Sequence, residues 1–402
     1  MGGIVVVGGG QAAASLVVKL RGLGYAGELT LISEEPVPPY QRPPLSKAYL
    51  MGDMTAERLF LKPEAFYADQ NIDLRLGVRV DSIDAGAKTL SAGGEEIGYD
   101  HLALCTGSVP RRLPAAIGGD LEGVYEVRTL ADVDQMEPAF EADRRVLVIG
   151  GGYIGLEAAA VASKLGLKVT LVEMADRILQ RVAAPQTSDY FRALHIERGV
   201  DLREGVGLER LLGDKAVTGA RLTDGTELDL DFAIVGVGIS PATALAESAG
   251  LAVENGIRTD DRGRTSDPAI WAAGDCASLP YRGERIRLES VQNAIDQAEA
   301  VAANMLGADE AYVPKPWFWS DQYDVKLQIA GLNTGYDRVA VRAGEKPGAA
   351  SHWYFLGEQL LAVDAMNDAR NYMIGKRLIE GGKSPAPETI EDPATDMRAL
   401  LK

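Results

Sequence analysis

Two stretches of this sequence, residues 3–35 and 145–175, follow the same pattern. Each starts with a short β-branched run, passes through closely spaced glycines into an Ala- and Leu-rich stretch, and ends with a second β-branched run and an acid. A strand, a glycine-rich turn, a helix and a second strand in this order form a βαβ unit, whose two strands are parallel. The repeat therefore predicts an α/β fold built on parallel sheets.

The glycines in both stretches have the spacing of a loop that binds the pyrophosphate of a dinucleotide. Glycine permits a tight turn and a close approach of the backbone to phosphate, and the next helix presents free N–H groups and the positive end of its dipole. Alanine is small enough for the third position of this motif. The motif positions are Gly8, Gly10 and Ala13 in the first stretch and Gly150, Gly152 and Gly155 in the second.

An acid follows each glycine motif at the distance expected for a residue that binds a ribose hydroxyl. Glu34 lies 21 residues after Ala13, and Glu173 lies 18 residues after Gly155, near the expected spacing of about 20. Two glycine-rich helix starts in an ordinary α/β protein would not explain both acids. We therefore expect a bound flavin dinucleotide and a diffusing nicotinamide dinucleotide. Because Glu173 would repel a 2′-phosphate and the next arginine, Arg177, is four residues on, NAD is favoured over NADP.

The rest of the chain can be placed around these two units. Apolar runs at His101–Cys105, Phe232–Val237 and Ile270–Ala273 have the character of buried strands and are followed by glycines. A helical pattern covers residues 290–306, and from Pro314 aromatic, alternating runs predict a separate α+β domain.

Composition limits the class of protein. The chain is 46% hydrophobic with a formal net charge of −17 and two cysteines, which excludes a disordered chain and a disulfide scaffold. Such an acidic chain is a poor ligand for nucleic acid or an anionic membrane. No apolar run approaches the roughly 18–20 residues of a membrane span, and the N-terminus has no basic n-region. We therefore expect a cytoplasmic protein that binds neither nucleic acid nor membrane.

The motifs together resemble the FAD-dependent pyridine nucleotide–disulfide oxidoreductase superfamily and, within it, the putidaredoxin reductase-like ferredoxin reductases. The resemblance covers almost the whole chain. It rests on Gly8–Ala13, RPPLSK (42–47), CTG (105–107), RTL (128–130), GGGYIGLE (150–157), AAGDCA (272–277), ESVQNA (289–294) and PWFWSDQY (316–323). It implies a glutathione reductase-like fold with two Rossmann-like dinucleotide-binding domains. The expected domains are an FAD domain of residues 1–110 and 236–313, an NAD domain of residues 111–235 and a C-terminal α+β domain of residues 314–402.

The resemblance implies an NADH-dependent ferredoxin reductase. A hydride would pass from NADH to FAD, and single electrons would pass to a [2Fe-2S] ferredoxin that serves a cytochrome P-450 monooxygenase or a ring-hydroxylating dioxygenase. A rubredoxin reductase is the nearest alternative. A redox-signalling flavoprotein similar to apoptosis-inducing factor and a peroxide-forming NADH oxidase are further alternatives.

Lys47 and Glu157 are the expected catalytic residues. In the family, the lysine of the Pro-Pro-Leu-Ser-Lys segment lies over the flavin near N5, and Glu157 would pair with it. A positive charge there would stabilise the reduced, anionic flavin. The alternatives are a surface lysine and a first-turn glutamate favoured by the helix dipole.

The resemblance also assigns cofactor-binding residues. Arg42 would neutralise the pyrophosphate and Asp275 would accept from a ribityl hydroxyl, although Asp275 could instead cap a helix. Trp319 could equally be a core residue, and Tyr153 could cover the flavin or simply pack. The expected FAD residues are Gly8, Gly10, Gln11, Ala12, Ala13, Glu34, Arg42, Lys47, Val80, Thr106, Gly107, Arg128, Gly274, Asp275, Val291 and Trp319. The expected NAD residues are Gly150, Gly152, Tyr153, Ile154, Gly155, Glu173, Gly236 and Gly238.

The cysteines indicate which acceptor is reduced. A disulfide reductase needs a redox-active cysteine near the flavin, whereas Cys105 and Cys276 stand alone and have the character of small buried residues. Ser46 lies near the position where related coenzyme A-disulfide reductases carry cysteine. Without a CxxC motif, we expect no metal site in this chain and iron on a partner instead.

Ferredoxins are usually acidic, so an acidic reductase needs a local cationic docking face. The candidates are Arg285, Arg287, Lys315, Lys326, Arg338 and Arg370, with a mixed-charge solvated surface as the alternative for each. The aromatic C-terminal domain argues for a monomer rather than a disulfide-reductase dimer.

Overall fold

The computed structural model describes residues 2–402. The chain forms two compact units. The first comprises Met1–Arg42, Thr55–Val109 and Ile239–Pro316, and the second comprises Pro43–Met54, Pro110–Gly238 and Trp317–Lys402. The short segment Pro43–Met54 therefore leaves the first unit and belongs to the second.

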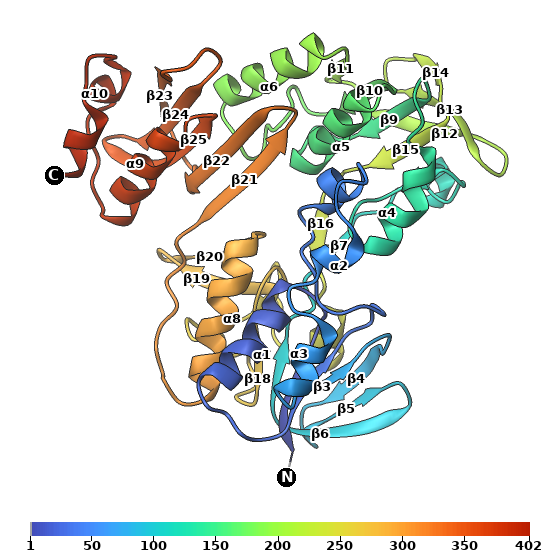
Figure 1. Cartoon of the computed structure of the whole chain (residues 1–402), viewed down its shortest axis with the longest axis vertical. Helices are drawn as coiled ribbons and strands as arrows, with labels where there is room; N and C mark the ends of the chain where they lie inside the picture. Colours follow the sequence, from blue (N-terminus) through green and yellow to red (C-terminus); the bar gives the residue numbers. More distant parts are fainter. Residues whose placement is uncertain (1) are drawn as a thin grey trace. The chain divides into compact units, whose positions relative to one another are not determined.

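The first unit is built on a parallel sheet, to which an antiparallel extension is added (Figure 1). Strands β3, β2, β1, β6 and β18 lie side by side and parallel, and the long β6 also pairs with β5, which pairs with β4, both antiparallel. The bounds are β1 (Gly3–Val7), β2 (Leu29–Ile32), β3 (Asp73–Arg75), β4 (Val80–Asp84), β5 (Thr89–Ala92), β6 (Glu95–Leu104) and β18 (Ile270–Ala272).

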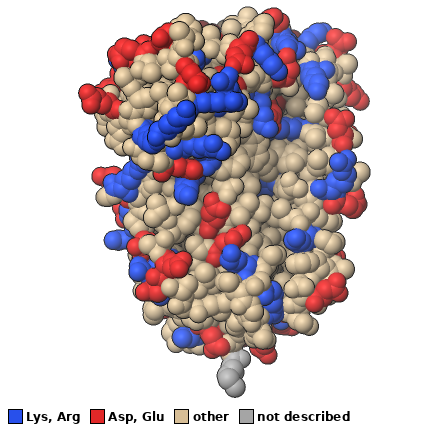
Figure 2. Space-filling model, turned by 60° about the vertical axis from the view of Figure 1, so that its left-hand side comes forward, with Lys and Arg blue, Asp and Glu red and all other residues tan. Residues whose placement is uncertain are grey.

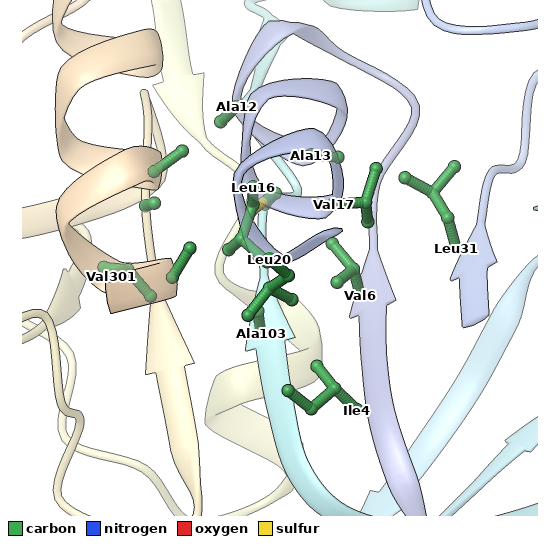
Figure 3. Packing of buried hydrophobic residues seen from close by; sticks show 14 of the residues in the cluster. Ile4, Val6, Ala12, Ala13, Leu16, Val17, Leu20, Leu31, Ala103 and Val301 are labelled. Atoms are coloured by element: carbon green, nitrogen blue, oxygen red, sulfur yellow. The ribbon is translucent and has the colours of Figure 1, made fainter. Parts of the chain in front are cut away.

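Helices α1 (Gln11–Gly22) and α8 (Val291–Met305) lie side by side and pack on this sheet (Figure 3). Leu16, Val17 and Leu20 recur at helical spacing on α1 and are fully buried. They pack with Val6 of β1 and Val301 of α8 in one apolar cluster. This packing holds the N-terminus of α1 at the end of β1.

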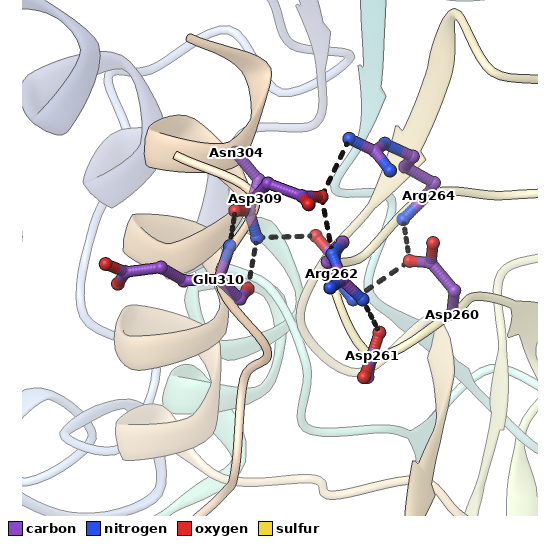
Figure 4. Close-up of polar contacts among 7 residues, drawn as sticks. All are labelled: Asp260, Asp261, Arg262, Arg264, Asn304, Asp309 and Glu310. Atoms are coloured by element: carbon purple, nitrogen blue, oxygen red, sulfur yellow. Dashed lines mark hydrogen bonds and ion pairs between the residues drawn. The ribbon is translucent and has the colours of Figure 1, made fainter. Parts of the chain in front are cut away.

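A polar cluster at the end of α8 fastens the helix to a neighbouring loop (Figure 4). Buried Asn304 donates to the carbonyls of Arg262 and Glu310, at 3.1 and 2.8 Å, and accepts from the N–H of Glu310 at 2.8 Å. Arg262 also pairs with Asp309 at 2.6 Å. The loop and the helix end are therefore held by hydrogen bonds in addition to apolar packing.

Short elements complete the first unit. They are α2 (Ala56–Leu59), α3 (Glu64–Asp69), β7 (Ser108–Pro110), β16 (Ile239–Pro241), α7 (Ala244–Ser248), β17 (Ile257–Arg258), β19 (Ala277–Tyr281) and β20 (Glu284–Ile286).

The second unit repeats the same topology. Its parallel sheet has the order β11-β10-β9-β15-β8, so the strand before the glycine loop again lies between the strand that follows the helix and a later strand of the chain. The elements are η2 (Ala115–Ile117), β8 (Val124–Tyr125), α4 (Leu130–Met136), η3 (Glu137–Ala139), β9 (Arg145–Ile149), α5 (Tyr153–Lys164), β10 (Lys168–Glu173), α6 (Pro185–Glu197), β11 (Asp201–Glu204), β12 (Leu208–Gly213), β13 (Val217–Leu222), β14 (Glu227–Asp229) and β15 (Phe232–Val235).

The C-terminal part of the second unit is a five-stranded antiparallel sheet with helix α9 packed on it. Trp353 and Phe355 of the sheet and Leu378 of the helix are fully buried in its core. The elements are β21 (Trp317–Gln322), β22 (Val325–Gly331), β23 (Arg338–Ala343), β24 (Ala350–Leu356), β25 (Gln359–Met366), α9 (Ala369–Glu380), α10 (Pro387–Glu391) and η4 (Met397–Leu401). The predicted α/β fold with two Rossmann-like units and a C-terminal α+β region is confirmed. Among the described residues, no helix has both the length and the apolar character needed to cross a membrane.

Candidate active site and cofactor sites

The glycine loop of the first unit is shaped by one close backbone approach and one open position. Gly8 has a φ of +132°, and a Cβ there would lie 2.1 Å from the carbonyl oxygen of Cys105. Gly10, directly before α1, has no atom within 4 Å of such a Cβ. The first N–H groups of a helix have no partner within that helix. Gly10 therefore opens onto an N-terminus suited to phosphate.

Several predicted flavin residues meet at the carboxyl ends of β1, β6 and β18. The N–H of Gly274 donates to Gln297 of α8 at 3.0 Å, and a Cβ at Gly274 would lie 3.0 Å from that of Ala12 in α1. Ser108 donates to Asp275 at 3.0 Å. Ligands of open parallel sheets bind at this edge. The loop, Ala12 and the Gly274–Asp275 turn together fit a dinucleotide.

Further predicted flavin residues border this edge. The Thr106 hydroxyl donates to the carbonyl of Ala242 at 2.7 Å, and Gly107 has a φ of +69°. Val291 is the first residue of α8, whose N-terminus is capped by the Ser290 hydroxyl, which accepts from Asn293 N–H at 3.1 Å. Because α1 and α8 pack together, Val291 at the start of α8 belongs to the same layer as the first glycine loop and α1.

Arg42 is held by an acid that the sequence analysis did not select. Its guanidinium lies 2.5 Å from Glu35 and 3.0 Å from the hydroxyl of Tyr40, which itself donates to Glu35 at 2.5 Å. Burial lowers the pKa of Arg42, but Glu35, Tyr40 and Asp275 together raise it above its ordinary value. Arg42 is therefore a fixed cation.

Glu34 and Val80 lie near each other in the first unit. Val78 N–H donates to Ser33 O at 2.9 Å, which joins the segment before β4 to the end of β2. Glu34 is 70% exposed and pairs with Arg79 at 3.6 Å, whereas Val80 is buried. Glu34 is thus accessible to a ribose, and its role stays a prediction. The Ser33 hydroxyl is buried without a hydrogen-bond partner among the described residues.

The second glycine loop repeats the construction of the first. Gly150 has a φ of +109°, and a Cβ there would lie 2.4 Å from the carbonyl oxygen of Gly236. A Cβ at Gly155 would lie 2.1 Å from the carbonyl oxygen of Gly150. Gly152, directly before α5, is open. This loop therefore fits a second dinucleotide.

Glu173 lies against this second loop. Its two carboxylate oxygens accept from Gly151 N–H at 2.7 Å and Ala175 N–H at 2.8 Å. Arg177 donates to the Ser188 hydroxyl at 2.5 Å and to the carbonyl of Gln180 at 3.3 Å. The acid at the end of β10 is therefore fixed beside the loop, while the nearest arginine after it is occupied elsewhere.

Residues of α5 face strand β21 in matched register. Tyr153 packs on Phe318, with ring centroids 4.9 Å apart, and Glu157 accepts from the Ser320 hydroxyl at 2.7 Å. Four residues of helix rise about 6 Å and two residues of strand rise about 6.6 Å, so the two pairs align. Ile154, next to Tyr153, is 47% exposed.

Lys47 and Glu157 form a buried ion pair. Their Nζ and Oε1 atoms are 2.9 Å apart, with side chains 15% and 4% exposed. The second carboxylate oxygen accepts from Ser46 at 3.0 Å, and Asp321 lies 3.5 Å from Lys47. Burial raises the pKa of Glu157, against the lowering effects of Lys47, Ser320 and Ser46. The donors around Glu157 therefore offset part of the cost of burying its charge.

Lys47 reaches Glu157 from an irregular turn. Residues Leu45–Tyr49 form a π-helical turn (η1) in which Lys47 departs from helical geometry, and the turn contacts α5 and α4. Tyr49 anchors it by donating to Asp134 of α4 at 2.6 Å. Arg128 is half-buried directly before the Thr129 capping box that starts α4. Trp319 stands in β21 beside Ser320 and packs on Trp317, with ring centroids 5.5 Å apart.

The two cysteines are free and buried. Burial raises the pKa of both thiols, so they stay neutral. Cys276 donates weakly to the carbonyls of Leu104 and Ala273, each at 3.4 Å. Neither has the character of a reactive thiolate.

Sequence reasoning did not identify several polar residues of the second unit. Ser320, Gln322 and His195 are fully buried and continue a hydrogen-bonded chain from Glu157. The signal for Ser320 and Gln322 was the alternation within PWFWSDQY, which places both on the same face of a strand; His195, in α6, lies outside that motif.

The comparisons with known proteins agree with this geometry. Residues 2–298 match the family model described as pyridine nucleotide-disulphide oxidoreductase, and residues 317–401 match the one described as reductase C-terminal. The ferredoxin–NAD(P)(+) reductase of a Sphingomonas species is 42% identical over 99% of this chain and 96% of its own. Putidaredoxin reductase CamA of Pseudomonas putida is 40% identical over 99% and 96%.

A solved structure is similarly close. The covalent putidaredoxin reductase–putidaredoxin complex matches with a TM-score of 0.96 and 39% identity, over 100% of this chain and 98% of that one. The chain belongs to the pyridine nucleotide-disulphide oxidoreductase family. It is an oxidoreductase, and its family implies a flavin and a nicotinamide cofactor. Within the family its similarity is to the ferredoxin reductases, which confirms the resemblance found in the sequence.

Proposed function

We propose that this chain is an NADH-dependent ferredoxin reductase that holds FAD and reduces a [2Fe-2S] ferredoxin. One observation carries the proposal. Helix α5 starts at the open loop position Gly152 and, one turn later, presents Glu157 to Lys47. A single rigid helix thus joins a dinucleotide-binding loop to a buried cation. This arrangement suits a reaction between a nicotinamide and a flavin that Lys47 stabilises.

The first unit would hold FAD. Support comes from the open cradle at Gly10, the turn Gly274–Asp275 beside Ala12, and the buried Ser33 hydroxyl, which has no hydrogen-bond partner within residues 2–402. Arg42 would place its charge near the pyrophosphate. The remaining assignments are Gly8, Gln11, Ala13, Glu34, Val80, Thr106, Gly107 and Val291 of this unit and Lys47, Arg128 and Trp319 of the second.

The second unit would bind NADH through the loop Gly150–Gly155, with Tyr153 and Ile154 at its helix start. Gly236 and Gly238 would allow a close backbone approach. Glu173, whose oxygens already lie at the loop, would accept from the ribose hydroxyls and repel a 2′-phosphate. Arg177 donates to the Ser188 hydroxyl and to the carbonyl of Gln180, so it would have to give up these hydrogen bonds to pair with a 2′-phosphate. We infer a preference for NADH over NADPH.

When bound, FAD accepts a hydride from NADH and releases electrons singly to an iron–sulfur protein. Lys47 would hold its ammonium group against the flavin and stabilise negative charge there. Glu157 would fix the position of that ammonium group, and Ser46 and Ser320 would keep Glu157 charged. The ferredoxin as partner is supported by the solved complex of putidaredoxin reductase with putidaredoxin.

We also propose a domain division, a cellular compartment and an oligomeric state for this protein. We infer an FAD domain of residues 1–110 and 236–313, an NAD domain of residues 111–235 and a C-terminal domain of residues 314–402. The two free cysteines support a reducing compartment, the cytoplasm. The relatives' names support a ferredoxin that serves an oxygenase system, and we infer that the reductase acts as a monomer.

The test is NADH-driven cytochrome c reduction by the FAD-loaded protein, with and without a bacterial [2Fe-2S] ferredoxin. We expect a ferredoxin-dependent increase of at least about tenfold, with NADPH supporting a far lower rate. Reduction of rubredoxin but of no ferredoxin would replace the proposal with rubredoxin reductase. Rapid NADH consumption with oxygen alone would point to an oxidase, and flavin bleaching without any turnover would favour a signalling flavoprotein.

A further inference from the structure

A line of buried polar side chains leads from helix α6 to the Lys47–Glu157 pair. Tyr323 Oη lies 3.3 Å from His195 Nδ1, and His195 Nε2 lies 2.9 Å from Gln322 Oε1. Gln322 Nε2 lies 3.2 Å from Ser320 Oγ, which lies 2.7 Å from Glu157 Oε1. His195, Gln322 and Ser320 are fully buried. The line therefore has no competing solvent along its middle.

The chemistry of these groups gives the line one direction. An ionised Glu157 can only accept, so the single hydroxyl proton of Ser320 must go to it. Ser320 Oγ then accepts from the amide nitrogen of Gln322, which turns the amide oxygen of Gln322 towards His195. His195 must donate from Nε2, and its Nδ1 must accept from Tyr323.

We propose that His195 and Gln322 are positioning residues for the Lys47–Glu157 pair, with His195 locked as its neutral Nε2–H tautomer. The inference rests on the proposed function. A serine hydroxyl can rotate, and Ser320 alone could direct its proton away from Glu157. Gln322 prevents this because its amide already donates to Ser320, and His195 fixes the orientation of that amide. The line thus keeps Ser320 as a second donor on Oε1 of Glu157, beside Lys47, while Ser46 donates to the other oxygen.

The surroundings of His195 favour its neutral form. Burial lowers its pKa to about 4, partly offset by Gln322. Tyr323 packs edge-on to the ring at 5.1 Å, and the Arg198 guanidinium lies 5.2 Å from the centre of the Tyr323 ring. Arg198 is itself paired with Asp324 at 2.7 Å. A protonated imidazole would donate from both nitrogens and lose the hydrogen bond from Tyr323.

The first part of the test is ¹⁵N NMR of the FAD-loaded protein with labelled histidine. The chain has three histidines, so single substitutions assign each signal. We expect His195 to show the Nε2–H tautomer from pH 6 to 8 without titrating. An Nδ1–H tautomer, or titration near the ordinary value of about 6.5, would overturn the inference.

The second part is the pH dependence of flavin reduction by NADH in a single turnover. His195→Phe and Gln322→Met should raise the acidic limb of the profile by about one pH unit, since Glu157 loses an oriented donor. His195→Gln keeps an amide donor for Gln322 and should restore the wild-type profile. Tyr323→Phe removes only a hydroxyl and covers the case in which the larger changes fail to fold.

The matched control is Ser351→Ala. Ser351 is a fully buried serine of the C-terminal sheet, where it accepts from Trp353 Nε1 at 3.0 Å, outside this line. It should leave the profile unchanged. An unchanged profile in folded His195→Phe and Gln322→Met would overturn the inference while the wild-type protein still reduces ferredoxin. Absence of ferredoxin reduction by the wild-type protein would instead overturn the proposed function.

Discussion

At the scale of single residues, the glycines of each loop have separate tasks. Gly8 and Gly150 are required because a neighbouring carbonyl occupies the space of a Cβ. Gly10 and Gly152 have extended backbones and open surroundings. An alanine at either open position would therefore strain nothing in the protein and would fill space that a pyrophosphate needs.

We predict that Gly10→Ala lowers the flavin content of the protein by about tenfold or more. Gly152→Ala should raise the KM for NADH by a similar factor. The free energy of unfolding of the cofactor-free protein should change by less than about 1 kcal/mol, since the backbone conformation suits alanine. Flavin content and steady-state kinetics measure both effects. Gly22→Ala, at the far end of α1 and also in open space, is the control. Normal flavin content in Gly10→Ala would contradict the assignment.

The pair Lys47–Glu157 makes a second prediction at this scale. Lys47→Met leaves a buried carboxylate without its cation and should lower the free energy of unfolding by about 3 kcal/mol. The double variant Lys47→Met/Glu157→Gln should recover at least half of this loss. Urea unfolding measures both. Simple additivity of the two single changes would show that the side chains do not interact in solution.

At the scale of elements, the sequence predicted the helices and strands that follow from local periodicity. The helix expected at residues 290–306 spans Val291–Met305 with Ser290 as its cap, and both βαβ units start and end close to their predicted limits. Contacts between distant segments could not be predicted. Ser320 and Glu157 are 163 positions apart, and no spacing rule joins a strand serine to a helix glutamate. The choice of Glu35 rather than Glu34 as the partner of Arg42 also depends on how the chain turns after β2.

Another unpredicted feature is a buried acid that joins α6 to the C-terminal sheet. Asp364 of β25 accepts from the Tyr354 hydroxyl and from Thr187 of α6, the latter at 2.8 Å. Thr187 also lies 2.8 Å from His352 Nδ1. The other oxygen of Asp364 is buried without a hydrogen-bond partner in the described part of the chain. Burial raises the pKa of Asp364 to about 6.

The raised pKa of Asp364 predicts that this residue destabilises the folded protein in a pH-dependent way. Because the pKa is higher in the folded than in the unfolded chain, folded protein holds the proton more tightly, and stability from this group falls as pH rises from about 4 to about 6. The difference from the ordinary value of 3.8 corresponds to at most about 3 kcal/mol. Asp364→Asn should therefore gain stability relative to wild type between pH 4.5 and pH 7. Urea unfolding at both values measures it, and a difference that does not change with pH would contradict the prediction.

At the scale of the whole molecule, charge is distributed as local pairs. Figure 2 shows basic and acidic side chains interspersed over much of the face drawn, with several basic side chains gathered in its upper half. Arg338 pairs with Glu388 and Glu391, and Arg370 pairs with Glu345. These two residues are therefore weaker docking candidates than the sequence indicated.

Two further arginines have structural tasks within the first unit. Arg287 is 12% exposed, pairs with Glu289 and donates to the carbonyl of Asp275 at 3.4 Å. Arg285 donates to the carbonyl of Thr259 at 2.8 Å. Reversing the charge of Arg287 should therefore disturb the Gly274–Asp275 turn, where we propose that FAD binds, and lower reduction of ferricyanide as well as of ferredoxin. The exposed Lys315 and Lys326 are better positions at which to test docking.

The most direct test of the account is the stoichiometry of anaerobic electron transfer. A trace of the FAD-loaded protein is mixed with excess [2Fe-2S] ferredoxin, NADH is added in known amounts, and ferredoxin reduction is followed by the loss of its visible absorbance. Two ferredoxins should be reduced for each NADH consumed, because a hydride carries an electron pair and each cluster takes one electron. Consumption of NADH without ferredoxin reduction would contradict it.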